Sequence, residues 1–421
     1  MDEFVDRRDK WQPKSRPDWV ARLNEEGSVL DMESIVPLDE DSLIASAIRK
    51  TGLSDFGEDG WHEHFHQLIT AINNEAQLNF MGRILTRNDM VNFLAIRLQV
   101  QDLYKRHPEI NEQTISEPVM FLGHGRTGTT ILLEVLSRDP QFRVVKRWEA
   151  MYPCPPPEEA TYADDPRIEK AHKEITIFDR ITPEWRAMHK FGGDLPVECA
   201  EFLYACFLSN VFPCAYQIPS YVEYMGTQDP LYTIRWHEKI LKLLQWKYKR
   251  KHWLLKNPIW IDMIPQVLEV YPDAKIILTH RDPVVVADSI VNVMGTLYWW
   301  RTDDPWGGGM MEELVMPNNR AQSQNNLIRW MEEGVLKPGA HSNVLYQDFM
   351  SDPTAVIRQI YQDLSLTLTA EALDAMLKYL DDRPQTKYGK YKYKSIDGAA
   401  LQVERKLFKH YQDYFGVESE I

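Results

Sequence analysis

The chain has 421 residues, 44% of them hydrophobic, and a formal net charge of −14 at pH 7. This acidic balance, with no long block of Lys and Arg, excludes proteins that bind nucleic acid or anionic membranes by general charge attraction. The sequence shows no signal core, no stretch near the roughly 20 apolar residues that span a bilayer and no paired spacing among its four Cys residues. We therefore expect a cytoplasmic protein without a disulfide framework.

The chain is longer than one compact core usually allows, so we expect a region appended to the main domain. Residues 1–116 are predicted to supply it, as an N-terminal arm rich in charge and proline followed by a helical extension. In residues 42–108 the apolar positions follow a helical period, with Thr86 or Asn88 as a candidate cap. One helical face is marked by Val91, Leu94 and Leu98. We expect the extension to pack against the main domain, and a contact in a homodimer is its alternative role.

Residues 117–421 are predicted to form an α/β domain, with a central parallel sheet of the P-loop type flanked by helices. Short apolar runs rich in β-branched residues alternate there with helical stretches such as residues 259–270. The runs that we expect to be strands are Val119–Leu122, Trp253–Leu255, Lys275–Thr279 and Asn343–Tyr346. Parallel sheets of this kind bind ligands at the carboxyl ends of their strands, so the residues that follow each run are the candidates for a site.

The first strand runs into a turn rich in glycine and hydroxyl groups, Gly125-Arg126-Thr127-Gly128-Thr129-Thr130. Its spacing from Gly123 is that of an ATP-binding P-loop, but Thr129 replaces the lysine that reaches the terminal phosphates and Arg126 supplies a cation earlier. Successive backbone N–H groups and a helix N-terminus favour an anion at such a turn. Because the missing lysine argues against γ-phosphoryl transfer, the turn predicts a phosphorylated ligand other than ATP. An ordinary strand-to-helix turn is the alternative.

Two later strands end in basic residues. Lys256 closes the strand at residues 253–255, and Arg281 follows the strand at residues 275–279, with Ser289 eight residues further on. A guanidinium presents a planar fork to a phosphate and a hydroxyl adds a neutral donor, so Arg281 and Ser289 suit a fixed dianion. The alternatives are a surface salt bridge for Arg281 and a solvated strand end for Lys256.

Together these residues resemble the donor-binding motifs of sulfotransferases, over roughly residues 117–415. The resemblance implies that the turn at residues 125–130 binds the donor 3'-phosphoadenosine 5'-phosphosulfate (PAPS), and that Arg281 and Ser289 hold its 3'-phosphate. It also implies that Lys256 lies beside the bridging oxygen between phosphate and sulfonate, where a desolvated ammonium stabilises developing charge.

A basic, aromatic segment late in the chain, residues 387–394, resembles the loop that closes on PAPS in this family. On this resemblance Lys390 and Lys392 are assigned to donor binding. The Arg-Lys-Gly of cytosolic members is absent here, so the resemblance does not decide which lysine contacts phosphate. A solvated strand with alternating charge is the alternative.

The resemblance leaves two candidates for the catalytic base, because Pro258 stands where many cytosolic sulfotransferases carry a histidine. In tyrosylprotein sulfotransferases and a broad group of bacterial sulfotransferases, a glutamate downstream of the loop arginine is the candidate, and Glu149 matches its position. Glu149 would take the hydroxyl proton of the acceptor. A structural carboxylate that pairs with Arg147 or with a helix terminus is its alternative role, and His189 is the reserve base.

The prediction is thus a PAPS-dependent sulfotransferase that transfers the sulfonyl group in line to a hydroxyl of a small-molecule alcohol or phenol. Arg126, Lys256 and the loop amides could replace the magnesium of kinases, so no metal is expected. One rival is a P-loop kinase, which magnesium-dependent consumption of ATP would reveal. The other is a catalytically silent nucleotide-binding protein. We expect no nucleic-acid or membrane partner, and leave a homodimer open.

Overall fold

The computed structural model describes residues 6–310, 316–382 and 394–421. Within these residues five parallel strands form one sheet in the order β2-β3-β1-β4-β5. The strands are β1 Val119–Phe121, β2 Phe142–Arg143, β3 His252–Lys256, β4 Lys275–His280 and β5 His341–Leu345. The predicted α/β fold with a parallel sheet is confirmed. Periodicity did not reveal β2, because two residues are too few to show a pattern.

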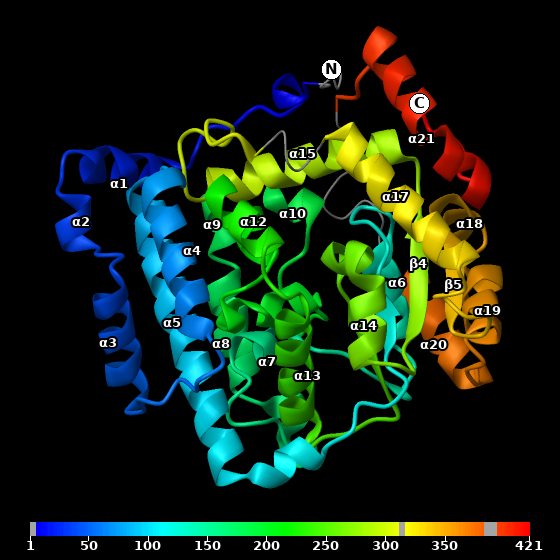
Figure 1. The fold of residues 1–421 in the computed structure, drawn as a ribbon, viewed down its shortest axis with the longest axis horizontal. Helices are drawn as coiled ribbons and strands as arrows, with labels where there is room; N and C mark the ends of the chain where they lie inside the picture. The colour runs from blue at the N-terminus through cyan, green and yellow to red at the C-terminus, as the bar shows by residue number, and fades with distance from the viewer. Residues whose placement is uncertain (1–5, 311–315, 383–393) are drawn as a thin grey trace.

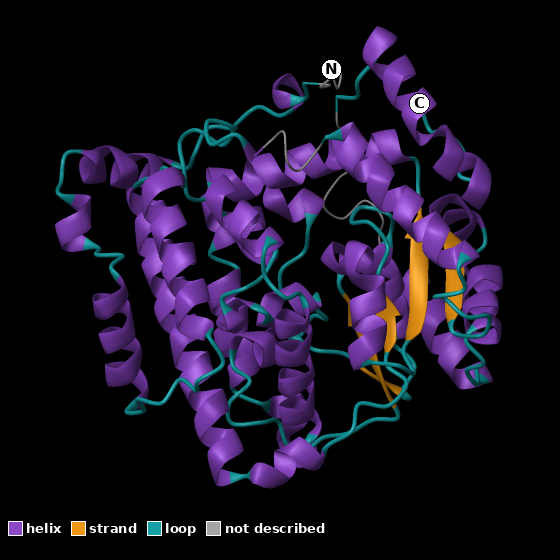
Figure 2. Ribbon diagram, in the orientation of Figure 1, coloured by secondary structure: helices purple, strands orange, loops and turns teal. Residues whose placement is uncertain are grey.

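Alternate residues of the strands enter two separate cores, one on each face of the sheet. Phe121 and Ile277 join the core on one face, whereas Leu255 and Leu278 join the core on the other, as the two-residue period of a strand requires. The first face is covered by α6 Thr129–Leu136, α19 Pro353–Asp363 and α20 Ala370–Asp381. The second is covered by α13 Leu231–Gln245, α14 Ile264–Val270 and α17 Pro317–Glu332. Figure 2 shows the strands enclosed between these helices, which explains their continuous apolar sequences.

The N-terminal region is helical, as predicted. It contains α1 Asp18–Ser28, α2 Met32–Ile35, α3 Glu40–Thr51, α4 Trp61–Glu75 and α5 Phe80–Arg106, which lie to one side of the sheet (Figure 1). Helix α5 begins after Asn79, whose side chain accepts a hydrogen bond from the Gly82 backbone N–H at 2.8 Å. The predicted caps Thr86 and Asn88 are therefore wrong, since both lie inside α5. Helices α3 to α5 share a hydrophobic core with residues 200–221. The domain boundary at residue 116 stays a prediction.

The described residues also form α-helices outside these groups. They are α7 Arg147–Met151, α8 Arg167–Ile175, α9 Phe178–Ile181, α10 Trp185–Met188, α11 Val211–Ala215, α12 Pro219–Gly226, α15 Pro283–Trp299, α18 Tyr346–Ser351 and α21 Gly398–Phe415. Helix α15 crosses the top of the molecule (Figure 1). Arg7 in the N-terminal arm is fully buried and donates to Asp288 of α15 and Glu404 of α21. No helix in the described residues combines the length and the apolar character needed to cross a bilayer.

Gly123 allows β1 and β4 to approach closely where the sheet ends. A Cβ atom at this position would lie 2.4 Å from Thr279 Oγ1 and 2.6 Å from the Thr279 backbone nitrogen. Only glycine therefore fits between the two strands without a shift of backbone atoms.

Gly123→Ala should lower the free energy of unfolding by about 1–3 kcal/mol, because the added methyl group overpacks a backbone contact. Urea denaturation followed by circular dichroism measures the change. Gly125→Ala is the matched control, since the nearest atom to its Cβ, Pro258 Cβ, would be 4.0 Å away. Equal stability of the two variants would contradict the close approach at Gly123.

Candidate active site

The predicted phosphate-binding turn lies at the carboxyl end of β1 and leads into α6. Arg126 and Gly128 both adopt left-handed backbone, with φ of 69° and 91°. At Gly128 the absent side chain also makes room for the Tyr346 ring, whose Cδ2 would lie 2.8 Å from an added Cβ. The Thr127 hydroxyl points into the protein, where it donates to the His124 carbonyl and hydrogen-bonds Thr279 Oγ1, each at 2.5 Å. Thr127 therefore fixes the shape of the turn with its side chain.

The turn and the Arg281 motif, which are far apart in the sequence, meet in space. Arg126 Nε donates to Ser289 Oγ at 2.9 Å, and Arg281 Nη1 donates to the Arg126 carbonyl oxygen at 3.3 Å. The Arg281 guanidinium also lies 4.2 Å from the centre of the Tyr346 ring. The loop cation and the two residues expected at the 3'-phosphate thus belong to one continuous site.

Lys256 ends β3 beside the turn, and its side chain is 2% exposed. Its Nζ donates to Thr130 Oγ1 at 2.7 Å and lies 2.6 Å from Glu198 Oε1. The Glu198 side chain keeps 32% of its surface exposed, so it reaches solvent from beside the ammonium. Burial alone would raise the pKa of Glu198, but the Lys256 ammonium, with smaller effects of His189 and Arg147, holds that pKa below its usual range.

Glu198 was missed at the sequence level. It precedes a short 3-10 turn, Cys199–Phe202, and no motif marks it. The one signal was a pair of acidic residues, Glu198 and Glu201, in an otherwise apolar stretch, Val197–Cys206, and it does not distinguish between the two.

His189, the reserve base, belongs to the same neighbourhood. Burial lowers its pKa to about 3, and the positive charge of Lys256 adds to the effect. Its ring packs near Trp185 and Phe191, at centroid distances of 5.8 and 5.7 Å. The imidazole is therefore neutral at physiological pH and poorly suited to hold a proton.

Glu149 is fully buried, and both of its carboxylate oxygens are engaged. Oε1 accepts from Arg143 Nη2 at 2.6 Å, while Oε2 accepts from the Lys146 backbone N–H and from the Tyr162 hydroxyl, each at 2.9 Å. These contacts cap helix α7. They match the structural role that the sequence left open for Glu149, although the partner is Arg143 instead of the expected Arg147, which pairs with Glu201.

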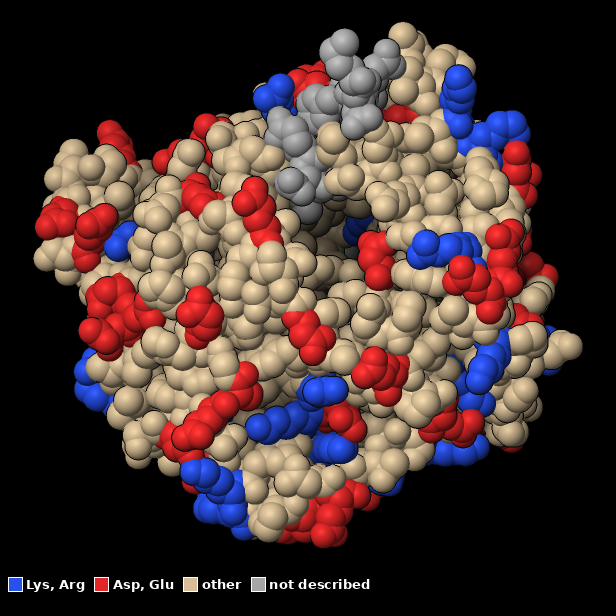
Figure 3. Space-filling view, in the orientation of Figure 1, with Lys and Arg blue, Asp and Glu red and all other residues tan. Residues whose placement is uncertain are grey.

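Two of the predicted donor ligands, Lys390 and Lys392, lie outside the described residues. Among the residues that are described, no group of three or more His, Cys, Asp and Glu is placed to hold a metal ion. Figure 3 shows a hollow in one face of the molecule, below α15 and between α12 and α14, with a Lys or Arg side chain inside it.

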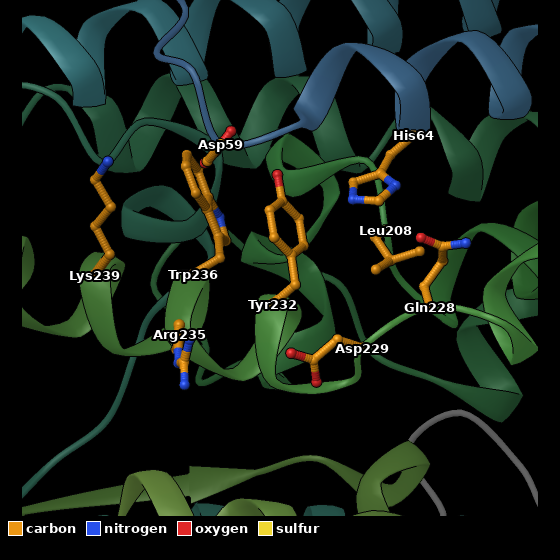
Figure 4. Close-up of a pocket in the computed structure, with 9 residues that line it drawn as sticks. All are labelled: Asp59, His64, Leu208, Gln228, Asp229, Tyr232, Arg235, Trp236 and Lys239. Carbon is orange, nitrogen blue, oxygen red and sulfur yellow. The ribbon is translucent and has the colours of Figure 1, made fainter.

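A separate cavity of about 390 Å³ lies between α13 and the region around α4. It is lined by Asp59, His64, Leu208, Gln228, Asp229, Tyr232, Arg235, Trp236 and Lys239. Figure 4 shows that Tyr232, Trp236 and Lys239 point toward the α4 side while Arg235 points away, so the polar groups do not converge. None of the lining residues belongs to the turn, to Lys256 or to the Arg281 motif, and this cavity is therefore not the site described above.

Comparison with known proteins identifies the family. A model of the sulfotransferase family matches residues 118–370, more than half of the chain. Omega-hydroxy-beta-dihydromenaquinone-9 sulfotransferase Stf3 from Mycobacterium bovis and from Mycobacterium tuberculosis is 28% identical over 290 residues. That similarity covers 67% of this chain and 71% of each relative.

Solved structures agree in fold. The crystal structure of sulfotransferase STF1 from M. tuberculosis H37Rv is 26% identical and superposes with a TM-score of 0.72, over 88% of this chain and 98% of that one. Sulfotransferase STF9 from Mycobacterium avium, at 24% identity, gives a TM-score of 0.74 over 91% of this chain and 98% of that one. The match to STF9 bears on the fold alone.

Glu149→Gln should lower the free energy of unfolding by about 3 kcal/mol, because it leaves the buried Arg143 guanidinium without a counter-charge. Urea denaturation measures the change. Glu158→Gln is the control, since it removes a pair with Lys247 in which both side chains are about half exposed and should cost less than about 1 kcal/mol. If the Glu149 variant were as stable as wild type, the buried pair of Glu149 with Arg143 would contribute nothing to the free energy of unfolding.

Proposed function

The chain belongs to the sulfotransferase family, and we propose that it transfers the sulfonyl group of PAPS in line to a hydroxyl group of a small apolar acceptor. The contact between the two anion-binding motifs carries this proposal. Arg126 touches Ser289, and Arg281 touches the backbone of Arg126, so one nucleotide with phosphates at both ends could engage both motifs. Separate clefts for Arg126 and Arg281 would have excluded such a donor.

In the proposed reaction the acceptor oxygen forms a bond to sulfur as the bond from sulfur to the 5'-phosphate oxygen breaks. The products are a sulfate ester and adenosine 3',5'-bisphosphate. Negative charge develops on the oxygen that leaves sulfur, and the desolvated ammonium of Lys256 is the group assigned to stabilise it. Arg126 and the backbone of residues 125–130 hold the phosphosulfate, and a carboxylate takes the proton of the acceptor hydroxyl.

We propose that Glu198 is the carboxylate that accepts this proton. Its carboxylate lies 2.6 Å from the Lys256 ammonium and is 32% exposed, whereas Glu149 is fully buried with both oxygens engaged. A base has to reach the substrate, and Glu198 meets this requirement. His189 beside it remains the second candidate. The pKa of each of the two groups is lowered, so the contact of Glu198 with the Lys256 ammonium carries the assignment.

The surroundings of His189 favour an apolar acceptor. A cluster that includes Trp185, Met188 and Trp300, with Phe178 and Phe191 packed against it, lies beside the histidine. Phe178 and Phe191 are only partly buried, and aromatic rings of this kind would bind apolar and aromatic groups well. The name of the relative Stf3 states omega-hydroxy-beta-dihydromenaquinone-9 as its substrate, which supports an alcohol or phenol with a lipid-like body as the acceptor class.

A mass-spectrometric screen tests the proposed function directly. The protein is incubated with PAPS and a panel of phenols, sterols, alkyl alcohols and prenyl alcohols, in the presence of EDTA. A sulfate ester formed with the release of adenosine 3',5'-bisphosphate supports the proposal. Turnover that requires ATP and magnesium would support a kinase, and bisphosphate binding without transfer to any acceptor would support a silent nucleotide-binding protein.

Glu198→Gln should reduce kcat by roughly 10²–10⁴ without weakening donor binding, because the variant removes the proton acceptor and keeps a side chain of the same size. Steady-state kinetics and calorimetry with adenosine 3',5'-bisphosphate separate the two effects. Glu201→Gln is the matched control, since Glu201 lies three residues away and pairs with Arg147 instead. Full activity of the Glu198 variant would move the role of base to another group.

Arg281→Ala should weaken the binding of adenosine 3',5'-bisphosphate by roughly tenfold or more, because a guanidinium fork to a phosphate is among the strong polar contacts. The affinity for adenosine 5'-monophosphate, which lacks the 3'-phosphate, should change little. Calorimetry with both ligands measures the difference. An equal loss for the two nucleotides would contradict the assignment of Arg281 to the 3'-phosphate.

A further inference from the structure

The guanidinium of Arg281 already has an anionic partner within the chain. Its Nε donates to Glu420 Oε1 at 2.7 Å and its Nη2 donates to Glu420 Oε2 at 2.8 Å. This is the two-pronged arrangement that a guanidinium makes with a carboxylate or with a phosphate. The remaining nitrogen, Nη1, donates to the Arg126 carbonyl.

The fold holds Glu420 in this place. The Glu420 backbone N–H donates to Asp282 Oδ2 at 2.7 Å. Asp282 also accepts hydrogen bonds from both terminal nitrogens of Arg405, at 2.6 and 2.7 Å. Arg405 also donates to the backbone carbonyl of Ile421 at 2.8 Å. These contacts tie residues 416–421 to α21 and to the start of α15, next to the proposed 3'-phosphate position.

Val417 adds an apolar anchor to the same segment. It is buried in a cluster with Ile328 and Tyr411. The segment is therefore placed by contacts independent of Arg281, and the Glu420 side chain could leave the guanidinium while the backbone around it stays anchored.

We propose that Glu420 and the 3'-phosphate of the donor compete for the Arg281 guanidinium, so that Glu420 lowers the affinity for nucleotides that carry a 3'-phosphate. The inference rests on the proposed function, because it takes Arg281 as the ligand of that phosphate. Nε and Nη2 of Arg281 cannot form this pair of hydrogen bonds with Glu420 and with a phosphate at the same time. The carboxylate has to leave this side of the guanidinium before a phosphate takes it.

The charges of the two competitors decide which of them the guanidinium binds when the donor is present. A phosphate monoester carries close to two negative charges at pH 7, and the Glu420 carboxylate carries one. A nucleotide with only a 3'-hydroxyl does not displace the carboxylate, so the pair of Arg281 with Glu420 stays in place and does not affect its affinity. The Arg281 and Glu420 side chains are 18% and 22% exposed, and an ion pair at the surface is weak enough to be replaced by a dianion.

Calorimetry on the full chain tests the competition. Glu420→Gln should bind adenosine 3',5'-bisphosphate roughly 3- to 10-fold more tightly than wild type, the range expected from the loss of one competing ion pair near the surface. Affinity for adenosine 5'-monophosphate should stay unchanged. Glu420→Ala should likewise bind the bisphosphate more tightly and leave the affinity for adenosine 5'-monophosphate unchanged. Glu418→Gln, in the same segment, should match wild type.

Each other outcome overturns the inference. Weaker bisphosphate binding by the Glu420 variants would show that the carboxylate positions Arg281 for the phosphate instead of competing with it. Unchanged binding in variants that fold as wild type, together with binding that depends on Arg281, would overturn this inference and leave the proposed function standing. No bisphosphate binding by wild type or by any variant would overturn the proposed function and this inference with it.

Discussion

The parallel pairing of β1 with its two neighbours is the constraint on which the site depends. Phe121 of β1 pairs with Lys256 of β3 on one side and with Ile277 of β4 on the other. Because parallel strands end at the same edge of a sheet, the loop after β1, the lysine at the end of β3 and the arginine after β4 are delivered together. Gly123 then lets the loop lie directly against Thr279.

The site gathers several cations in an acidic protein, and two of them, Lys256 and Arg281, pair with carboxylates. Lys256 pairs with Glu198, Arg281 pairs with Glu420, and Arg126 donates to Ser289. Desolvated cations need such partners, since an unpaired charge away from water is costly. Both partner carboxylates therefore lie next to the proposed donor. Glu198 is placed where it could accept the proton of the acceptor, and Glu420 is placed where it could compete with the 3'-phosphate for Arg281.

The sequence predicted the strands and the residues at their ends because both signals are local. Apolar runs mark β1, β3 and β4, and Arg126, Lys256 and Arg281 stand at or just after their ends. Glu198 could not be predicted, since its contact with Lys256 depends on how the irregular chain around Cys199–Phe202 is packed. Glu149 was chosen for its position relative to Arg126, which carries no information about Arg143 and Tyr162 as its partners. The predicted caps of α5 failed because the helical period extends back to Phe80.

A crystal structure of the protein with adenosine 3',5'-bisphosphate tests the central claim most directly, because it locates both phosphates at once. The 5'-phosphate is predicted on the backbone of residues 125–130, and the 3'-phosphate on Arg281 and Ser289, with Glu420 turned away. A nucleotide bound elsewhere, or one that engages a single motif while its other phosphate faces solvent, would contradict the claim that the two motifs form one donor site.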